Sequence, residues 1–107
     1  MAVTDEQIAF VTDLFADIGP VTTRKMFGGL GIYTHGTIFA VLMSDGSLKL
    51  KGSGDMAQAF EAAGWQPWTY TRKDGAGAAM PYWTIPDPLL DEPDEICQWA
   101  RRAIDAL

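Results

Sequence analysis

The sequence predicts an α+β protein, a two-layer sandwich in which one antiparallel sheet of about five strands carries helices on one face. Apolar residues recur at helical spacing near both ends of the chain, whereas the middle holds short segments rich in β-branched and aromatic residues. Glycine-containing turns separate those segments, and such turns join neighbouring strands as antiparallel hairpins. The predicted order is α-β-β-β-α-β-β-α, in a single domain over residues 1–107.

The first helix is expected to begin at Thr4. The segment Thr4-Asp5-Glu6-Gln7 has the spacing of a capping box, in which Thr4 caps the first turn and Gln7 reaches back to the backbone of Thr4. The helix should end at Gly19-Pro20. Its apolar residues recur at helical spacing and should form a buried stripe: Ile8, Val11, Leu14, Phe15 and Ile18.

Three strands should follow as an antiparallel meander, over residues 30–34, 37–43 and 47–51. The turns that join them are His35-Gly36 and Ser44-Asp45-Gly46. Because helices should cover only one face of the sheet, the other face remains open to solvent or to a partner.

The open face is expected to present polar and basic side chains. The third strand of the meander alternates leucine with lysine, so its leucines should face the core while Lys49 and Lys51 face outward. Thr69 and Thr71 should lie on the same open face.

The second half of the chain should add a helix capped by Asp55 and closed by Gly64, followed by strands over residues 67–73 and 78–85. Pro81 has no N–H to donate, so the last strand should be an edge strand or carry a bulge. A final helix should begin in the acidic run at residues 91–95. Its buried stripe should comprise Ile96, Trp99, Ala103, Ile104 and Leu107.

The composition argues against several classes of protein. Fourteen acidic residues against eight basic ones give a net charge of −6, which disfavours generic nucleic-acid binding. The one cysteine, Cys97, cannot form an intramolecular disulfide, so a reducing cytoplasm is the simplest location. No apolar run approaches the roughly 20 residues that a membrane-spanning helix needs, and residues 1–6 do not resemble a signal peptide.

The residues that usually carry catalysis or bind metals do not form a recognisable site. His35 is the one histidine and is expected in an exposed turn, whereas Cys97 should pack as a structural thiol beside the stripe of the last helix. No paired ligand spacing for zinc is present, and the glycines at residues 28–31 match no phosphate-binding loop. The sequence therefore predicts a protein that is not an enzyme, with no catalytic residue, metal or cofactor.

Arg24 and Lys25 form the best candidate binding site. Residues 21–52 contain four basic residues and one acid, a local charge of +3 in an acidic chain. The structural alternative is that the pair forms ion pairs with Asp13 or Asp17, or lies over the edge of the sheet. The candidate binding residues are Arg24, Lys25, Gly28, Gly29, Lys49, Lys51 and Arg72.

The run from Arg24 to Tyr33, Arg-Lys-Met-Phe-Gly-Gly-Leu-Gly-Ile-Tyr, resembles the signature of the TfoX N-terminal domain family, whose founding members regulate competence in bacteria. The resemblance extends over roughly residues 19–107. Other segments also resemble family positions: Leu48-Lys49-Leu50-Lys51, Tyr70-Thr71-Arg72, residues 80–86 and Trp99-Ala100-Arg101-Arg102.

The resemblance implies a two-layer fold similar to that of secretion chaperones, and a regulator without known catalysis. The competence regulator of the family is thought to act as a co-activator with a cyclic-AMP-receptor-type factor and RNA polymerase, and it carries a second, helical domain. This chain is expected to be a single-domain member without that second domain. The implied partner is a protein, with the transcription machinery as one candidate, and the fold analogy adds a homodimer formed through a sheet edge.

The leading interpretation is a cytoplasmic regulatory or adaptor domain that binds a protein and does not contact a membrane. One alternative is a nucleic-acid-binding accessory protein that uses Arg24 and Lys25. The other is a small-molecule-binding module or enzyme, in which Trp68, Tyr70 and Tyr82 would line a deep aromatic pocket.

Overall fold

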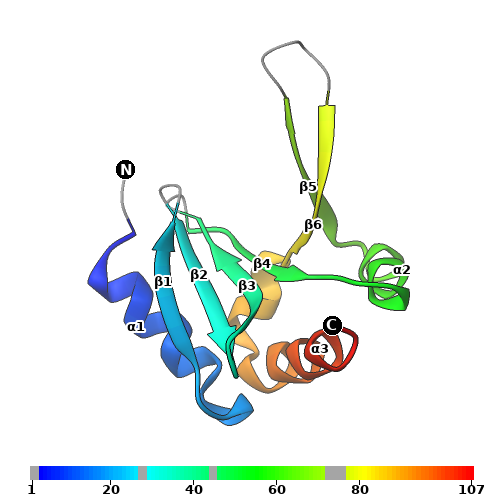
Figure 1. Cartoon of the computed structure of the whole chain (residues 1–107). Coiled ribbons are helices and arrows are strands. Elements are labelled where there is room, and N and C mark those ends of the chain that lie inside the picture. Colours follow the sequence, from blue (N-terminus) through cyan, green and yellow to red (C-terminus); the bar gives the residue numbers. More distant parts are fainter. Residues whose placement is uncertain (1–2, 27–28, 44–45, 72–76) are drawn as a thin grey trace.

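The computed structural model describes residues 3–26, 29–43, 46–71 and 77–107 (Figure 1). The α-helices are α1 (Asp5–Leu14), α2 (Asp55–Ala62) and α3 (Pro93–Asp105), and the short 3-10 helices are η1 (Ala16–Ile18) and η2 (Asp87–Asp91). The strands are β1 (Thr22–Met26), β2 (Gly29–Thr34), β3 (Thr37–Leu42), β4 (Leu48–Lys51), β5 (Gln66–Thr71) and β6 (Gly77–Thr84).

These strands form one antiparallel sheet in the order β1-β2-β3-β4-β6-β5. Figure 1 shows α1 and α3 behind the sheet, while α2 packs against β5 and β6. The predicted α+β class is therefore confirmed. One face of the sheet, here called the inner face, packs against the helices, and the opposite face is called the outer face.

Strand β1 is the strand that the sequence pattern missed. The first strand was expected at residues 30–34, but residues 22–26 already form a strand that pairs with β2, from Thr22 opposite Tyr33 to Met26 opposite Gly29. All four side chains from Thr22 to Lys25 are exposed, so the segment has no apolar alternation from which a strand could be recognised. The sheet consequently has six strands, with β1 at one edge.

The core lies between the inner face and the helices. Cross-strand register aligns Leu30, Leu42 and Leu48 in one inner row. A second inner row consists of Ile32, Ala40, Leu50 and Trp83. These residues form the buried core together with side chains from all three α-helices. The helices therefore cover the inner face, and the outer face remains open.

The aromatic part of this core is centred on Phe60. Its ring stacks on Trp65 at a centroid distance of 4.5 Å and lies 5.8 Å from Trp83 and 5.5 Å from Trp99. Gly52 lies against the same cluster, because a Cβ atom added there would be 2.7 Å from Cζ3 of Trp83. These contacts join α2 and α3 to β6, to the end of β4 and to the residue that precedes β5.

The first helix begins as predicted, but it is shorter than expected. Thr4 and Gln7 form both bonds of the capping box: the backbone N–H of Gln7 donates to Oγ1 of Thr4, and that of Thr4 donates to Oε1 of Gln7. The α-helix ends at Leu14, and the chain continues as η1 before Gly19, whose φ of 121° suits glycine.

Two expectations about the other two helices were wrong. Gly54, not Asp55, is the N-cap of α2, and no side chain caps that helix. Leu107 was expected in the buried stripe of the last helix, but α3 stops at Asp105, and Leu107 lies beyond its end with 43% of its surface exposed. The last helix begins at Pro93, within the acidic run as predicted. Gly64 closes α2 as expected, with a φ of 86°.

Pro81 lies in an internal strand, because β6 pairs with both β4 and β5. The expectation of an edge strand was therefore wrong, but the alternative, a bulge, was right. Pro67 pairs with Trp83 and Thr69 with Ala79, so β6 advances by four residues where β5 advances by two. Pro81 sits in this irregularity, and its carbonyl accepts a hydrogen bond from the N–H of Gly52 at 3.0 Å.

The turns agree with expectation wherever the structure describes them. His35 and Gly36 join β2 to β3 with φ of 51° and 79°, the left-handed backbone that a two-residue hairpin turn uses. Gly46 has a φ of 91°, whereas Ser44 and Asp45 lie outside the described residues.

Candidate functional site

The outer face can be assembled from strand register. Directly paired residues share a face, so the chain of partners Arg24, Gly31, Val41, Lys49 and Thr84 forms one outer row across five strands. Thr22 lies opposite Tyr33 at one end of the face, and Lys51 lies opposite Tyr82 further along it. Trp68 belongs to the same face because it contacts both Lys49 and Tyr82.

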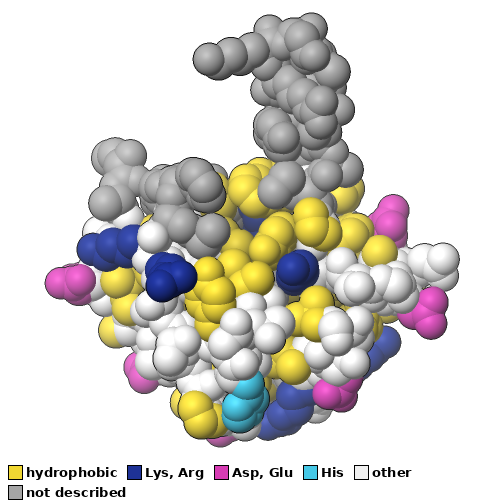
Figure 2. Space-filling view, in the orientation of Figure 1, with side chains coloured by type: hydrophobic (Ala, Val, Ile, Leu, Met, Phe, Trp, Pro, Cys, Tyr) yellow, Lys and Arg dark blue, Asp and Glu magenta, His cyan; other side chains and the backbone are white. Residues whose placement is uncertain are grey.

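The charged side chains of these outer positions are all basic: Arg24, Lys49 and Lys51. In Figure 2 the face toward the viewer shows basic and hydrophobic side chains, and the acidic ones visible there lie toward the rim. A basic face on a chain with a net charge of −6 concentrates positive potential in one place.

Lys49 does not project into solvent as the alternation predicted. Only 7% of its surface is exposed, and its Nζ donates hydrogen bonds to Oγ of Ser47 at 3.2 Å and Oγ1 of Thr84 at 3.0 Å. The same ammonium lies 5.7 Å from the centre of the Trp68 ring. Tertiary neighbours from β5 and β6 therefore bury a side chain that the local pattern placed outside. Lys51, two residues further, is only half-buried.

We expect Lys49→Ala to lower the free energy of unfolding by about 1–3 kcal/mol, because the change removes two hydrogen bonds and the packing of the lysine stem. Lys51→Ala on the same strand and face should change it by less than about 0.5 kcal/mol. Urea denaturation followed by tryptophan fluorescence compares the two variants. Equal effects would show that Lys49 is not held by its neighbours.

Among the side chains that the structure describes, Tyr33, Tyr82 and Trp68 place aromatic rings on the outer face. The Trp68 and Tyr82 rings meet edge to face at 6.0 Å. Burial raises the pKa of Tyr82 above its ordinary value of 10.0, and the neighbouring Tyr33 raises it further. The hydroxyl of Tyr82 is therefore neutral at physiological pH. Tyr33 is half-exposed.

Arg24 and Lys25 are adjacent in sequence but point to opposite faces of β1. Arg24 pairs with Gly31 in the outer row, whereas Lys25 pairs with Leu30, whose side chain lies in the core. Both are exposed, and neither side chain makes a hydrogen bond or ion pair within the residues that the structure describes. The alternative in which they pair with Asp13 or Asp17 is therefore not what the structure shows. Arg24 alone of the two belongs to the outer face.

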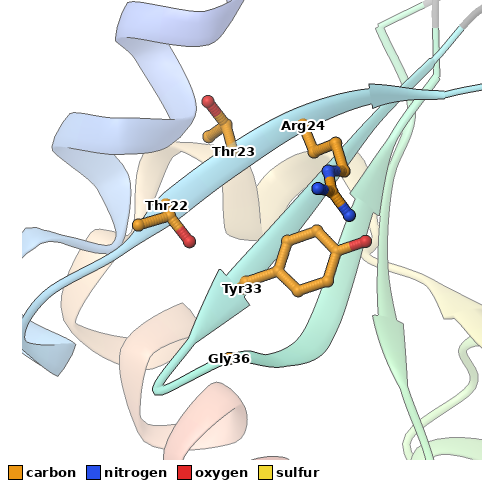
Figure 3. Close-up of a pocket in the computed structure, with 5 residues that line it drawn as sticks. All are labelled: Thr22, Thr23, Arg24, Tyr33 and Gly36. Atoms are coloured by element: carbon orange, nitrogen blue, oxygen red, sulfur yellow. The ribbon is translucent and has the colours of Figure 1, made fainter.

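Arg24 borders a hollow of about 350 Å³ at the β1 edge, which Figure 3 shows in close-up. Its guanidinium reaches over toward the ring of Tyr33, and the two threonines lie alongside on β1. The lining residues are Thr22, Thr23, Arg24, Tyr33 and Gly36. A guanidinium beside hydroxyl groups is suited to hydrogen-bonding a carboxylate or another anion.

The other candidate binding residues are less informative. Gly29 begins β2 and is buried opposite Met26. Gly28 and Arg72 lie outside the described residues, as do the side chains of Thr69, Tyr70 and Thr71.

Cys97 and His35, the residue types that most often act as nucleophile or base, lie in different surroundings. Cys97 is buried, and its Sγ lies 3.1 Å from the carbonyl oxygen of Leu14, to which it donates a hydrogen bond. His35 is exposed in the β2–β3 turn. Within the described ranges, no three side chains of His, Cys, Asp or Glu lie close enough together to hold a metal ion. No helix in the same ranges is both long and apolar enough to cross a membrane.

Cys97 gives a prediction that depends on pH. Burial is the main cause of its raised pKa; Asp17 and Asp94 add to the shift and Arg101 opposes it. The folded state thus holds the thiol proton more tightly than the unfolded chain. The resulting stability should be complete below the ordinary thiol pKa of about 8.5 and fall as pH rises through the higher folded pKa.

Urea midpoints measured from neutral to alkaline pH should therefore decline less in Cys97→Ala than in the wild type.

In native buffer the Cys97 thiol should react with Ellman's reagent only as fast as the folded chain opens. Immediate labelling of the folded protein would contradict the buried position.

Sequence reasoning missed the side chains that shape the hollow. Thr22, Thr23, Tyr33 and Gly36 were not among the candidate binding residues, because the strand that brings Thr22 opposite Tyr33 was not recognised. The β-branched pair Thr22-Thr23 before the basic residues was the available signal for that strand.

Comparisons with known proteins agree with the resemblance noted in the sequence. The model of the TfoX N-terminal domain matches residues 13–107. A curated relative, DNA transformation protein TfoX1 of Aliivibrio fischeri (strain ATCC 700601 / ES114), is 25% identical over 88 residues. That match covers 82% of this chain but only 41% of the relative. The chain belongs to the TfoX N-terminal domain family.

Proposed function

We propose that this chain is a non-enzymatic regulatory domain that binds a protein partner through the outer face and the exposed β1 strand. The observation that carries the proposal is Arg24, an exposed cation without an ion pair in the described structure, at the rim of a hollow on an otherwise acidic protein. Unpaired surface cations beside aromatic rings are suited to recognition of a complementary acidic surface.

The family adds a context for this binding. The curated relative is named for DNA transformation, and the family is linked to competence regulation. We extend the proposal to a cytoplasmic role in which the partner belongs to the transcription machinery. Since the chain spans 41% of that relative, the activity of the whole relative enters here as a proposal.

The proposal is tested by capturing partners from a nuclease-treated lysate of the source organism with tagged protein, beside the double variant Arg24→Glu/Lys25→Glu. Both side chains are exposed and make no hydrogen bond or ion pair with the residues that the structure describes, so the variant should fold with an unchanged urea midpoint. We expect the wild type to recover a protein that the variant loses. Equal recovery by both would contradict the proposal.

A second candidate, a nucleic-acid-binding accessory protein, draws support from the basic outer positions Arg24, Lys49 and Lys51. Contacts to phosphate release counterions, so such binding would weaken steeply with salt. Recovery that disappears on nuclease treatment would favour this candidate over the first.

The third candidate, a small-molecule module with an aromatic pocket, receives less support from the geometry. Trp68 and Tyr82 pack against each other, and Lys49 lies over Trp68. Their rings contact protein side chains rather than standing apart around a cavity.

A further inference from the structure

We propose that the free edge of β1 accepts an extended acidic segment of a partner protein as an additional strand, with a carboxylate of that segment bound in the hollow beside Arg24. The inference rests on the proposed function and identifies the part of the partner that binds.

The backbone of β1 provides the first half of the argument. β1 is the terminal strand of the sheet and is hydrogen-bonded to β2 alone among the strands of the described structure. An edge strand presents unpaired N–H and C=O groups along its outer side, and an extended peptide can pair with them. The strand has five residues, from Thr22 to Met26, enough for a short strand to add.

The side chains of β1 provide the second half, since they determine which peptide fits. Arg24 faces the outer side of the sheet and Lys25 the helix side, so adjacent acidic residues of an added strand would each meet one cation. On the outer side, a glutamate opposite Thr22 or Arg24 could reach the hollow that Tyr33 borders. Its carboxylate would accept hydrogen bonds from the guanidinium.

The same charges argue against a second copy of this chain as the occupant. If two β1 strands paired with each other, the Arg24 and Lys25 side chains of both copies would gather on one short ribbon. Like charges opposite each other destabilise strand pairing, and lysines on an edge strand oppose self-association. An acidic segment removes that repulsion and satisfies both cations.

The test uses the full chain and a fluorescein-labelled octapeptide of valine and threonine with two adjacent central glutamates, followed by fluorescence anisotropy. We expect Arg24→Glu to weaken binding about tenfold or more. Arg102→Glu, the same charge reversal at an exposed position on α3, should leave the affinity within about twofold. A peptide with lysines in place of the glutamates should bind Arg24→Glu better than it binds the wild type, a rescue that a misfolded variant could not give.

Two further peptides test strand addition itself. One carries N-methyl groups on its odd-numbered amides and the other on its even-numbered amides. In an added strand, alternate amide N–H groups point toward β1 and the others point toward solvent. The peptide that is methylated on the amides facing β1 should lose binding, and the other peptide should keep it. Equal binding by the two peptides, equal effects of Arg24→Glu and Arg102→Glu, or no binding to the wild type would overturn the proposal.

These outcomes are separate from the test of the proposed function. A wild-type chain that captures a protein through Arg24 and Lys25 but binds none of the peptides would overturn strand addition while the regulatory proposal stands. Capture that is indifferent to Arg24 and Lys25 would overturn the proposed function.

Discussion

Phe60→Ala should lower the free energy of unfolding by about 3–5 kcal/mol. Phe60 is completely buried and stands between Trp65, Trp83 and Trp99, so truncation leaves a cavity that rigid rings cannot fill. A domain of this size has about 5–15 kcal/mol of stability in total, so the loss is a large fraction of it.

Urea denaturation measured by far-ultraviolet circular dichroism gives the change, because tryptophan fluorescence would itself respond to the altered cluster. The control is Phe10→Ala, since Phe10 is 46% exposed and its truncation should cost less than about 0.5 kcal/mol. Similar losses for the two phenylalanines would mean that Phe60 is not the centre of the core.

Gly52→Val should lower the free energy of unfolding by about 3 kcal/mol through overpacking. A Cβ atom at Gly52 would lie 2.7 Å and 2.9 Å from two ring carbons of Trp83 and 3.1 Å from Cδ2 of Phe60, before the two methyl groups of valine are added. Both rings are held in the core and cannot swing into solvent as a flexible side chain could. The backbone N–H of Gly52 also donates a hydrogen bond to the carbonyl oxygen of Pro81, so the backbone at Gly52 cannot move away from the rings without losing that bond.

The matched control is the neighbouring Ser53→Val, at a half-exposed position outside the aromatic cluster. Thermal unfolding should show a clear drop in the midpoint for Gly52→Val and a much smaller one for Ser53→Val. If Gly52→Val unfolds at the wild-type midpoint, the close approach of Gly52 to Trp83 is wrong.

The sequence predicted the elements that depend on local chemistry. The Thr4–Gln7 box and the His35-Gly36 turn both act within a few residues, so their geometry is encoded where it occurs. The apolar stripe of the last helix was also largely right, because Ile96 and Ala103 are buried against the sheet.

What the sequence could not show depends on pairing between distant segments. The side chains from Thr22 to Lys25 are exposed on both faces of β1, and the segment is a strand because β2 pairs with it, so these residues carry little signal of their own. Lys49 is buried because Thr84 and Trp68 arrive from β6 and β5. Pro81 is tolerated in an internal strand because a bulge falls opposite Trp68.

The candidate site illustrates the same limit. Arg24 and Lys25 were predicted to act as a pair, but a strand places adjacent residues on opposite faces. At the β1 edge, the Arg24 side chain therefore lies on the outer face and the Lys25 side chain on the inner face. The hollow beside Arg24 exists only because Tyr33 is brought opposite Thr22. The residues that lie together at this edge are therefore identified from the pairing of β1 with β2, and not from their spacing in the sequence.

The central claim is that β1 and the outer face form the surface that binds a partner. Amide hydrogen exchange on the wild-type chain, alone and with the captured partner, tests it most directly. The account predicts new protection in the β1 segment Thr22–Met26 and little change in α3, whose buried residues face the core. Protection confined to α3, with β1 exchanging as in the free protein, would contradict it.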